Sequence, residues 1–119
     1  MSTSDISAPL RPAAFHILLA LEDEDRHGYG IMQAVREQSG GRLEPRTGSF
    51  YPRLARLIDS GLVSNAPGRR LGDDPRRGTY YRLTTRGRRV LEAEKRRLAD
   101  LVASLTFDPA LAGSRRGRG

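Results

Sequence analysis

The stretch TGSFYPRLARLIDSGLV, residues 47–63, predicts an amphipathic α-helix that ends at a glycine. Its apolar side chains recur at the spacing of one helix face and would form a buried stripe: Phe50, Leu54, Leu57 and Ile58. The hydroxyl groups at the start of the stretch can cap free backbone N–H groups. Pro52 removes at most one backbone hydrogen bond, because it lies in or just past the first turn. The polar and basic side chains are left on the other faces of this helix.

Two helices are predicted before this stretch. Pro12 suits the first turn of a helix, where its missing N–H costs nothing, and apolar residues continue to about Leu21. A polar turn of four acidic residues, 22–25, follows and is expected to be solvated. From Gly28 to about Gln38, apolar residues at helical spacing predict a second helix, which the following Ser-Gly-Gly sequence stops.

The chain after the third helix predicts a hairpin and one more helix. Residues 62–65 and 79–83 are rich in aromatic and β-branched side chains, and turn residues flank the polar segment between them. Thr84 or Thr85 can cap a last helix that reaches about Leu105. This helix is longer than a small core needs, so its apolar stripe is predicted to pair with a second copy of the chain.

The order of these elements predicts a mainly α fold with a small β-hairpin. Three helices, a hairpin and a long helix are typical of a winged helix-turn-helix, whose third helix lies in the DNA major groove. We expect residues 12–84 to form this domain and residues 85–106 to form a dimerisation helix. Residues 1–11 are expected to be a disordered arm, and residues 107–119 a flexible basic tail.

Positive charge is concentrated in the middle of the chain. The net charge is +7, but residues 1–41 carry three Arg against six acidic residues, whereas residues 42–89 carry twelve Arg against four. A positive segment of this density suits a polyanion such as nucleic acid. The alternative is a solvated basic surface. The segment coincides with the connector, third helix and hairpin, which are the parts that would contact DNA.

Several other classes of protein have little support in the sequence. The chain lacks cysteine, which excludes disulfides and thiolate metal sites. Its two histidines, His16 and His27, have no partner at ligand spacing, so we expect no metal, no cofactor and no catalytic triad. His27 is expected to cap or pack at a helix start, and an enzyme is not expected. No apolar run is long enough to cross a bilayer and no signal segment opens the chain, which favours the cytoplasm.

Four segments in order resemble the PadR family of transcriptional regulators. They are HGYGI (27–31), GSFYPRL (48–54), LIDSGLV (57–63) and YYRLT (80–84), with Gly87 three residues further on. The resemblance implies a bacterial homodimeric repressor that binds an inverted repeat near its own promoter or a neighbouring operon. The single long helix at the end is similar to the shorter branch of the family. Ser49 and Phe50 replace the commoner Thr and Leu but keep a hydroxyl and an apolar side chain.

The candidate DNA contacts lie on the connector, the third helix and the hairpin tip. They are Arg42, Arg46, Ser49, Tyr51, Pro52, Arg53, Arg56, Arg69, Arg70, Arg76 and Arg77. A tyrosine hydroxyl or an arginine can bind phosphate, and arginine can also read guanine edges. The alternatives are a tyrosine that packs on the hairpin, a serine that caps its helix, and arginines that are only solvated.

A further set of apolar residues is expected to line the dimer interface or an effector pocket. This set is Phe15, Leu19, Leu91, Leu98, Leu101, Val102 and Leu105, with plain core as the alternative. The family resemblance implies that a small hydrophobic effector can lodge between the terminal helices of the dimer. The rival function is a winged-helix adaptor or RNA-binding module without operator specificity.

Overall fold

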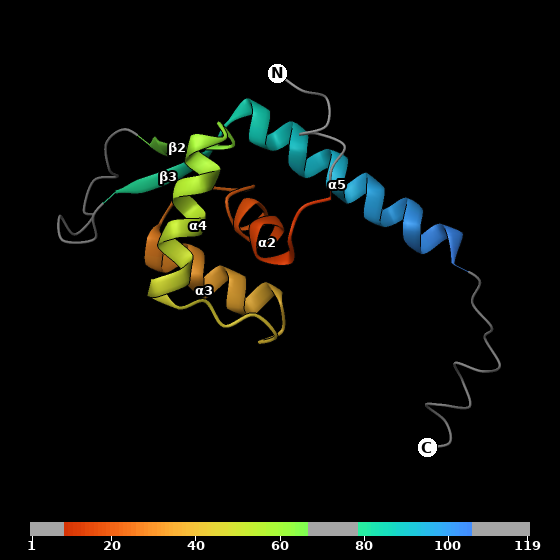
Figure 1. Ribbon diagram of the computed structural model, residues 1–119, viewed down its shortest axis with the longest axis horizontal. Helices are drawn as coiled ribbons and strands as arrows, with labels where there is room; N and C mark the ends of the chain where they lie inside the picture. The colour runs from red at the N-terminus through yellow and green to blue at the C-terminus, as the bar shows by residue number, and fades with distance from the viewer. Residues whose placement is uncertain (1–8, 67–78, 106–119) are drawn as a thin grey trace, which may run out of the picture.

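The computed structural model describes residues 9–66 and 79–105 (Figure 1). In chain order the elements are α2 (Pro12–Ala20), β1 (Arg26–His27), α3 (Gly28–Gln38), α4 (Thr47–Asp59), β2 (Val63–Ala66), β3 (Tyr80–Leu83) and α5 (Thr85–Ser104). This order confirms the predicted mainly α fold with three helices, a hairpin and a long last helix. The predicted tail and the predicted arm, apart from residues 9–11, lie outside the described residues.

The strands form a three-stranded antiparallel sheet in the order β1-β3-β2. The predicted hairpin is confirmed, with Val63 opposite Leu83 and Ala66 opposite Tyr80. The sequence did not predict β1, which pairs Arg26 with Tyr81 on the far side of β3. Two residues are too few to show the alternation that marks a strand, so β1 is defined only by its distant partner.

The core lies where α2, α3, α4, the sheet and the first half of α5 meet (Figure 1). Its most deeply buried side chains come from all of these elements: Leu18, Ile31, Leu54, Val63, Val90 and Leu91. The predicted stripe of α4 is confirmed for Phe50, Leu54 and Leu57, which are buried, whereas Ile58 is only partly buried. Burying one face of α4 leaves its opposite face available for contacts outside the domain.

Close packing fixes the start of α5 against the sheet. The Thr84 side chain accepts a hydrogen bond from the Gly87 N–H at 2.9 Å, which confirms the predicted cap, and its hydroxyl donates to the Gly61 carbonyl at 2.6 Å. A Cβ at Gly87 would overlap the carbonyl oxygen of Leu62 and would approach Leu83 to 2.8 Å. Only glycine therefore allows α5 to begin this close to β2.

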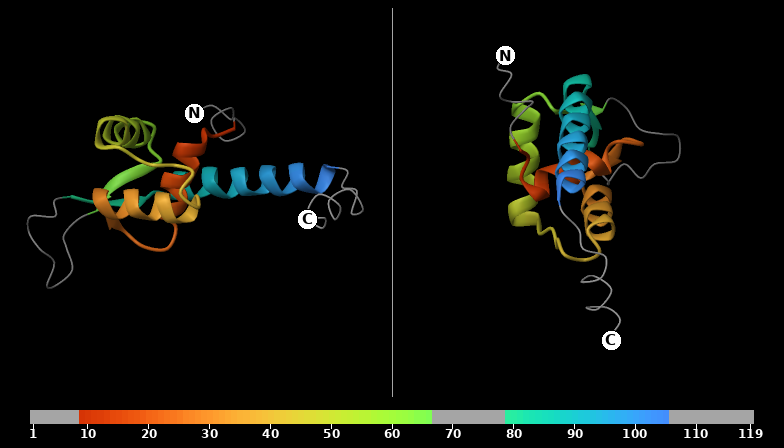
Figure 2. Two further views of the ribbon diagram at one scale, coloured as in Figure 1. Left: turned by 90° about the horizontal axis from the view of Figure 1, so that it is seen from below. Right: turned by 90° about the vertical axis from the view of Figure 1, so that its right-hand side faces the viewer.

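The two halves of α5 have different surroundings (Figure 2). Val90, Leu91 and Glu94 of its first half are buried. Leu91 was expected at the dimer interface or effector pocket, but it is fully buried in the core of its own chain and cannot also face a second copy. The second half extends beyond the other helices, and Leu101 and Val102 are exposed there.

Glu94 is a buried carboxylate that pairs with Arg97 of the same helix. Both of its oxygens accept hydrogen bonds from Arg97, at 2.7 and 3.0 Å. Hydrogen bonding from Arg97 lowers the pKa of Glu94; burial opposes this shift, and the Arg97 charge and the backbone of Leu10 add to it. The pairing with Arg97 therefore favours the ionised form of Glu94 despite its burial.

The acidic turn at residues 22–25 is not merely solvated, contrary to expectation. Glu22 pairs with Lys95 of α5, and Asp25 binds Arg82 of β3 at 2.9 Å. The turn thus connects the long helix with the sheet. Within the described residues, no helix combines the length and apolar character that crossing a membrane requires.

Candidate nucleic-acid interface

The outer face of α4 carries the side chains that the sequence proposed as DNA contacts. Ser49, Pro52 and Arg56 are exposed, as is Tyr51, whereas Arg53 is partly buried. The prediction that a hydroxyl caps α4 is wrong: Arg46 is the N-cap residue, and no side chain caps the helix. Ser49 instead donates a long hydrogen bond of 3.4 Å to the Arg46 carbonyl. Its hydroxyl is therefore not committed to holding the helix start.

Tyr51 lies at the junction of α4 with the start of α3. It is 41% exposed, and its ring meets that of Phe50 edge to face with 4.9 Å between centroids. Its hydroxyl lies over Gly28, where a Cβ would overlap it. Burial, followed by the nearness of Tyr51, raises the pKa of Tyr81 on β3. Tyr51 therefore has a packing role near both α3 and the sheet, while part of its side chain stays exposed to solvent.

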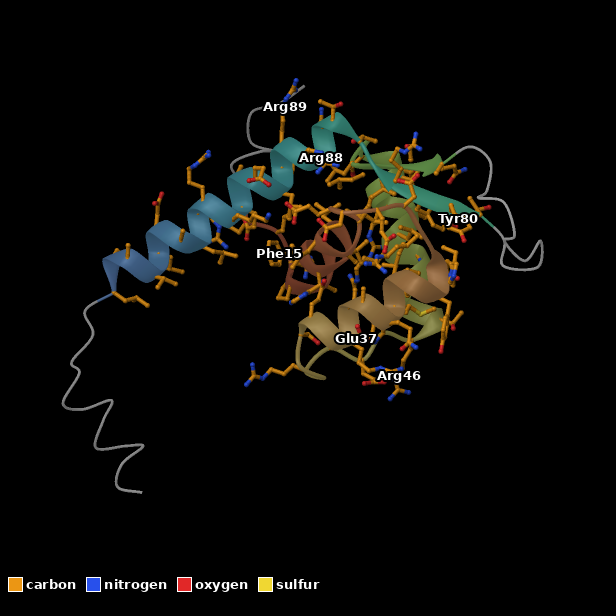
Figure 3. All side chains as sticks on the ribbon, turned by 180° about the vertical axis from the view of Figure 1, so that it is seen from behind. Phe15, Glu37, Arg46, Tyr80, Arg88 and Arg89 are labelled. Carbon is orange, nitrogen blue, oxygen red and sulfur yellow. The ribbon has the colours of Figure 1, made fainter. Side chains whose placement is uncertain are left out.

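The connector between α3 and α4 presents Arg42 and Arg46, both exposed. Figure 3 shows Arg46 at the edge of the domain opposite Arg88 and Arg89 of α5. Arg36 and Glu44 form an ion pair at 3.3 Å between the end of α3 and the connector, with both side chains more than half exposed. Such an exposed pair adds little stability, typically about 0–1 kcal/mol. Leu43 of the connector is better held, because it packs against the core and its N–H donates to the Ser39 hydroxyl at 3.0 Å.

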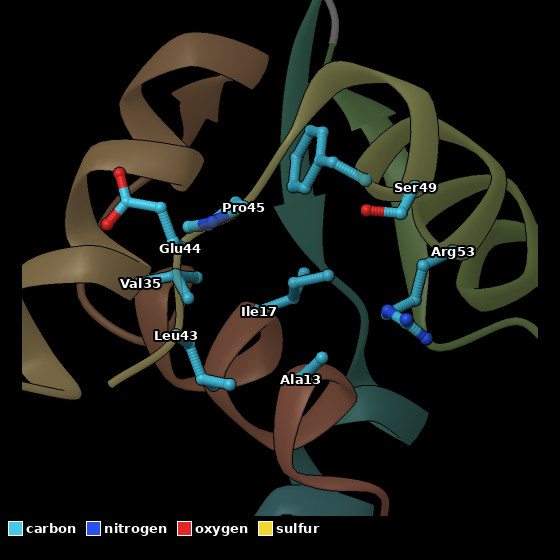
Figure 4. A pocket seen from close by; sticks show the side chains of 9 residues that line it. Ala13, Ile17, Val35, Leu43, Glu44, Pro45, Ser49 and Arg53 are labelled. Carbon is cyan, nitrogen blue, oxygen red and sulfur yellow. The ribbon is translucent and has the colours of Figure 1, made fainter. Parts of the chain in front are cut away.

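A cavity of about 160 Å³ lies between α2, the connector and the start of α4 (Figure 4). The side chains of Ser49 and Arg53 are directed from α4 toward it. Arg53 is therefore differently placed from Arg56, which is exposed and does not line the cavity. The sequence predicted both arginines as DNA contacts and favoured Arg53, but Arg56 is the more exposed of the two.

An aromatic cluster beside α4 includes a surface residue that the sequence analysis missed. His27 accepts a hydrogen bond from the Gly30 N–H at 3.0 Å, which confirms that it caps α3. Its ring stacks on Tyr29 and meets Tyr80 edge to face, with centroids 6.5 and 5.5 Å apart. Tyr29 is 60% exposed and accepts a hydrogen bond from Gln33. In the sequence, only the position of Tyr29 within the HGYGI motif (27–31) marked it as a residue that could contact DNA.

Arg82 belongs to the basic segment, but its charge is balanced within the chain. It donates to both oxygens of Asp25, at 3.3 and 2.9 Å. Hydrogen bonding to Asp25, followed by the carboxylate charge, raises the pKa of Arg82. The formal charge of the basic segment therefore overestimates the positive charge on β3 that is available to bind an anion. The four predicted arginines of the hairpin tip, Arg69, Arg70, Arg76 and Arg77, lie outside the described residues.

Both histidines make structural hydrogen bonds. The Gln38 amide donates to the His16 carbonyl at 2.6 Å and lies 3.1 Å from its ring nitrogen, while burial lowers the pKa of His16. In the part of the chain that the structure describes, no three His, Asp or Glu side chains are grouped to hold a metal ion. What this face offers is hydroxyl, aromatic and guanidinium groups, which bind anions and stack on or hydrogen-bond to bases.

Known proteins resemble this chain in both sequence and fold. A PadR family transcription regulator from Clostridium difficile R20291 is 25% identical, with a TM-score of 0.65, over 78% of this chain and 93% of that one. RosR of H. salinarum, in the complex structure hsRosR-S4, is 26% identical, with a TM-score of 0.62, over 98% of this chain and 89% of that one.

A relative from Streptomyces fradiae, described as an uncharacterized 37.1 kDa protein in transposon TN4556, is 40% identical over 85 residues. The match takes in 71% of this chain but spans only 22% of that protein. Residues 17–93, from the middle of α2 into the first half of α5, match the family described as "Transcriptional regulator PadR-like family". The chain belongs to this PadR-like family of transcriptional regulators.

Proposed function

We propose that this protein is a homodimeric repressor that reads duplex DNA through α4. The observation that carries the proposal is the division of α4 into a buried stripe and an outer face. That outer face presents Ser49, Tyr51 and Arg56 beside the exposed arginines of the connector. A helix held in this way can enter the major groove, while arginines at its start neutralise phosphates. The proposal includes no catalysed reaction.

The second part of the proposal is that two copies associate through the ends of α5. Leu101, Val102 and Leu105 are 48%, 68% and 57% exposed, and they lie beyond the body of the domain. A second copy would remove these apolar side chains from water. Two-fold symmetry would then set two α4 helices about 34 Å apart, in successive major grooves of an inverted repeat.

Release of the repressor is assigned to a small hydrophobic effector between the terminal helices of the two copies. Phe15, Leu19 and Leu98 are partly buried, and they would contribute to such a site. Binding here would change the angle between the two copies and so the distance between their α4 helices. Repression would follow when the dimer covers a promoter.

Fluorescence anisotropy with the duplex upstream of the gene, in excess random duplex, tests the proposal. We expect binding that survives the competitor and weakens about tenfold or more in Tyr51→Ala and in Arg56→Ala. Arg96→Ala is the matched control, because it removes an equal charge from an exposed position on α5. Binding should also weaken with salt, with a log–log slope of roughly −0.9 per phosphate neutralised.

Equal binding to every duplex, with no difference between the α4 variants and Arg96→Ala, would refute reading by α4. Preference for single-stranded RNA over duplex would point to the RNA-binding alternative instead. A DNA complex with one copy of the chain, measured by sedimentation, would refute the dimer.

A further inference from the structure

The cavity beside α4 has apolar walls and two hydrogen-bond donors on one side. Its walls come from α2, α3, the connector and α4: Ala13, Ile17, Val35, Leu43, Pro45 and Phe50. Ser49 and Arg53, one helical turn apart on the same face of α4, supply the donors (Figure 4). Its volume of about 160 Å³ is close to that of engineered apolar cavities, roughly 150 Å³, that accept benzene.

Within residues 9–66 and 79–105, no ion pair balances the guanidinium of Arg53. Arg53 is partly buried, and among the described residues it has no hydrogen bond or ion pair. The Ser49 hydroxyl makes only the long contact of 3.4 Å with the Arg46 carbonyl. A partly desolvated cation beside a weakly hydrogen-bonded hydroxyl favours an anionic ligand, because charge-assisted hydrogen bonds are strongest where water is scarce.

One acidic residue, Glu44, also lines the cavity. Its carboxylate points away from the cavity on the side of α3 and pairs with Arg36 at 3.3 Å (Figure 4). This pairing reduces its repulsion of a second anion. The cavity therefore combines a cationic side on α4 with apolar walls that include Ile17 and Phe50.

We propose that this cavity binds a short carboxylate with a compact aliphatic tail of roughly four to six carbons, a size set by comparison with cavities that hold benzene. The carboxylate would accept hydrogen bonds from the Arg53 guanidinium and the Ser49 hydroxyl. The tail would displace water from the walls formed by Ile17, Val35 and Phe50. A carboxylate without a tail would leave the apolar walls in contact with water, and an apolar molecule without a carboxylate would leave the Arg53 charge unpaired.

Binding of the carboxylate lowers DNA affinity; this step rests on the proposed function. Ser49 lies on the proposed DNA-reading face, and Arg53 was predicted from the sequence as a DNA contact, so a ligand that occupies their donors would keep both from DNA. The coupling is reciprocal, so DNA would weaken carboxylate binding by the same factor. This site lies inside the DNA-reading domain, apart from the effector position between the terminal helices.

The first experiment titrates 3-methylbutyrate into the free, full-length protein and follows backbone amide signals by NMR. We expect saturable shifts around the cavity and binding about tenfold weaker for the neutral 3-methylbutanamide, the loss expected for one charge-assisted hydrogen bond. Arg53→Met should weaken binding about as much. Arg56→Met, on the same helix but outside the cavity, should bind as the wild type does.

Ala13→Leu is a second test, because it fills the cavity without removing either donor. Amide dispersion and thermal unfolding establish that this variant is folded, and it should no longer bind the carboxylate. Absence of saturable binding to the wild type would overturn the proposal. So would equal binding of the amide, or equal losses in Arg53→Met and Arg56→Met.

The second experiment measures DNA affinity by anisotropy with and without saturating 3-methylbutyrate. Weaker DNA binding in the wild type but not in Ala13→Leu is the expected result. Carboxylate binding with unchanged DNA affinity would overturn the regulatory step. The NMR titration contains no DNA, so its result does not depend on whether the protein binds DNA through α4. Loss of the carboxylate proposal can therefore be distinguished from loss of the DNA-binding proposal.

Discussion

Replacing Gly87 with alanine tests how closely α5 must approach the sheet. The new Cβ would overlap the Leu62 carbonyl oxygen and would lie 2.8 Å from a methyl group of Leu83. Leu83 can move, but a backbone carbonyl in a strand-bound segment cannot turn aside. Overpacking costs roughly 1–3 kcal/mol, whereas Gly→Ala in a helix interior stabilises by about 1 kcal/mol. We place the clash at the upper end of its range and expect a net loss of about 2 kcal/mol.

Gly48→Ala is the matched control for this change. Gly48 lies in the first turn of α4, and a Cβ there would meet nothing within 4 Å. Only the helix-propensity gain then applies, so this variant should be as stable as the wild type or more stable, by up to about 1 kcal/mol. Urea unfolding followed by circular dichroism measures both. A Gly87→Ala protein at least as stable as the wild type would refute the close-contact reasoning.

Gly28→Ala should push Tyr51 out of place, because its Cβ would overlap the Tyr51 hydroxyl; DNA affinity should fall while urea unfolding changes little, since the end of that side chain can move. Arg97 lowers the folded-state pKa of Glu94, so ionised Glu94 stabilises the fold above the unfolded pKa, and this stabilisation is lost as pH falls through the folded pKa. The difference in unfolding free energy between the wild type and Glu94→Gln should therefore close as the solution is acidified below about pH 4.5. A difference that widens there would contradict this. Val102→Glu should dissociate the dimer in sedimentation without unfolding the domain, because Val102 is 68% exposed in one copy; a dimer of unchanged affinity would exclude this face as the interface.

The sequence predicted the elements that have a strong local pattern. The helix from Gly28 to Gln38 begins and ends where its apolar spacing and the following glycines indicated. The cap at Thr84 and the buried stripe of α4 were likewise predicted from short-range spacing. These features depend on neighbours within one or two helical turns.

Contacts between distant segments could not be predicted in the same way. Asp25 and Arg82 are 57 positions apart, and Glu22 and Lys95 are 73 apart, so nothing in the acidic turn itself marks its partners. Strand β1 depends in the same way on β3. Leu91 continued the apolar stripe of the last helix, but only the packing of α5 shows that this position belongs to the core. The partial burial of Arg53 likewise follows from how α2 and the connector meet α4.

Because the first half of α5 is packed into the core, the length of its second half sets the position and rotation of whatever is attached to its end. Each residue inserted into the exposed segment would rotate everything beyond it by about 100° and advance it by about 1.5 Å. In a dimer joined at the ends of α5, a one-residue insertion before Leu101 would turn the two α4 helices out of phase on the duplex. A seven-residue insertion would nearly restore the phase, because two turns of an α-helix take about 7.2 residues. The length of this helix would therefore select the spacing between operator half-sites, without any change in the residues that read them.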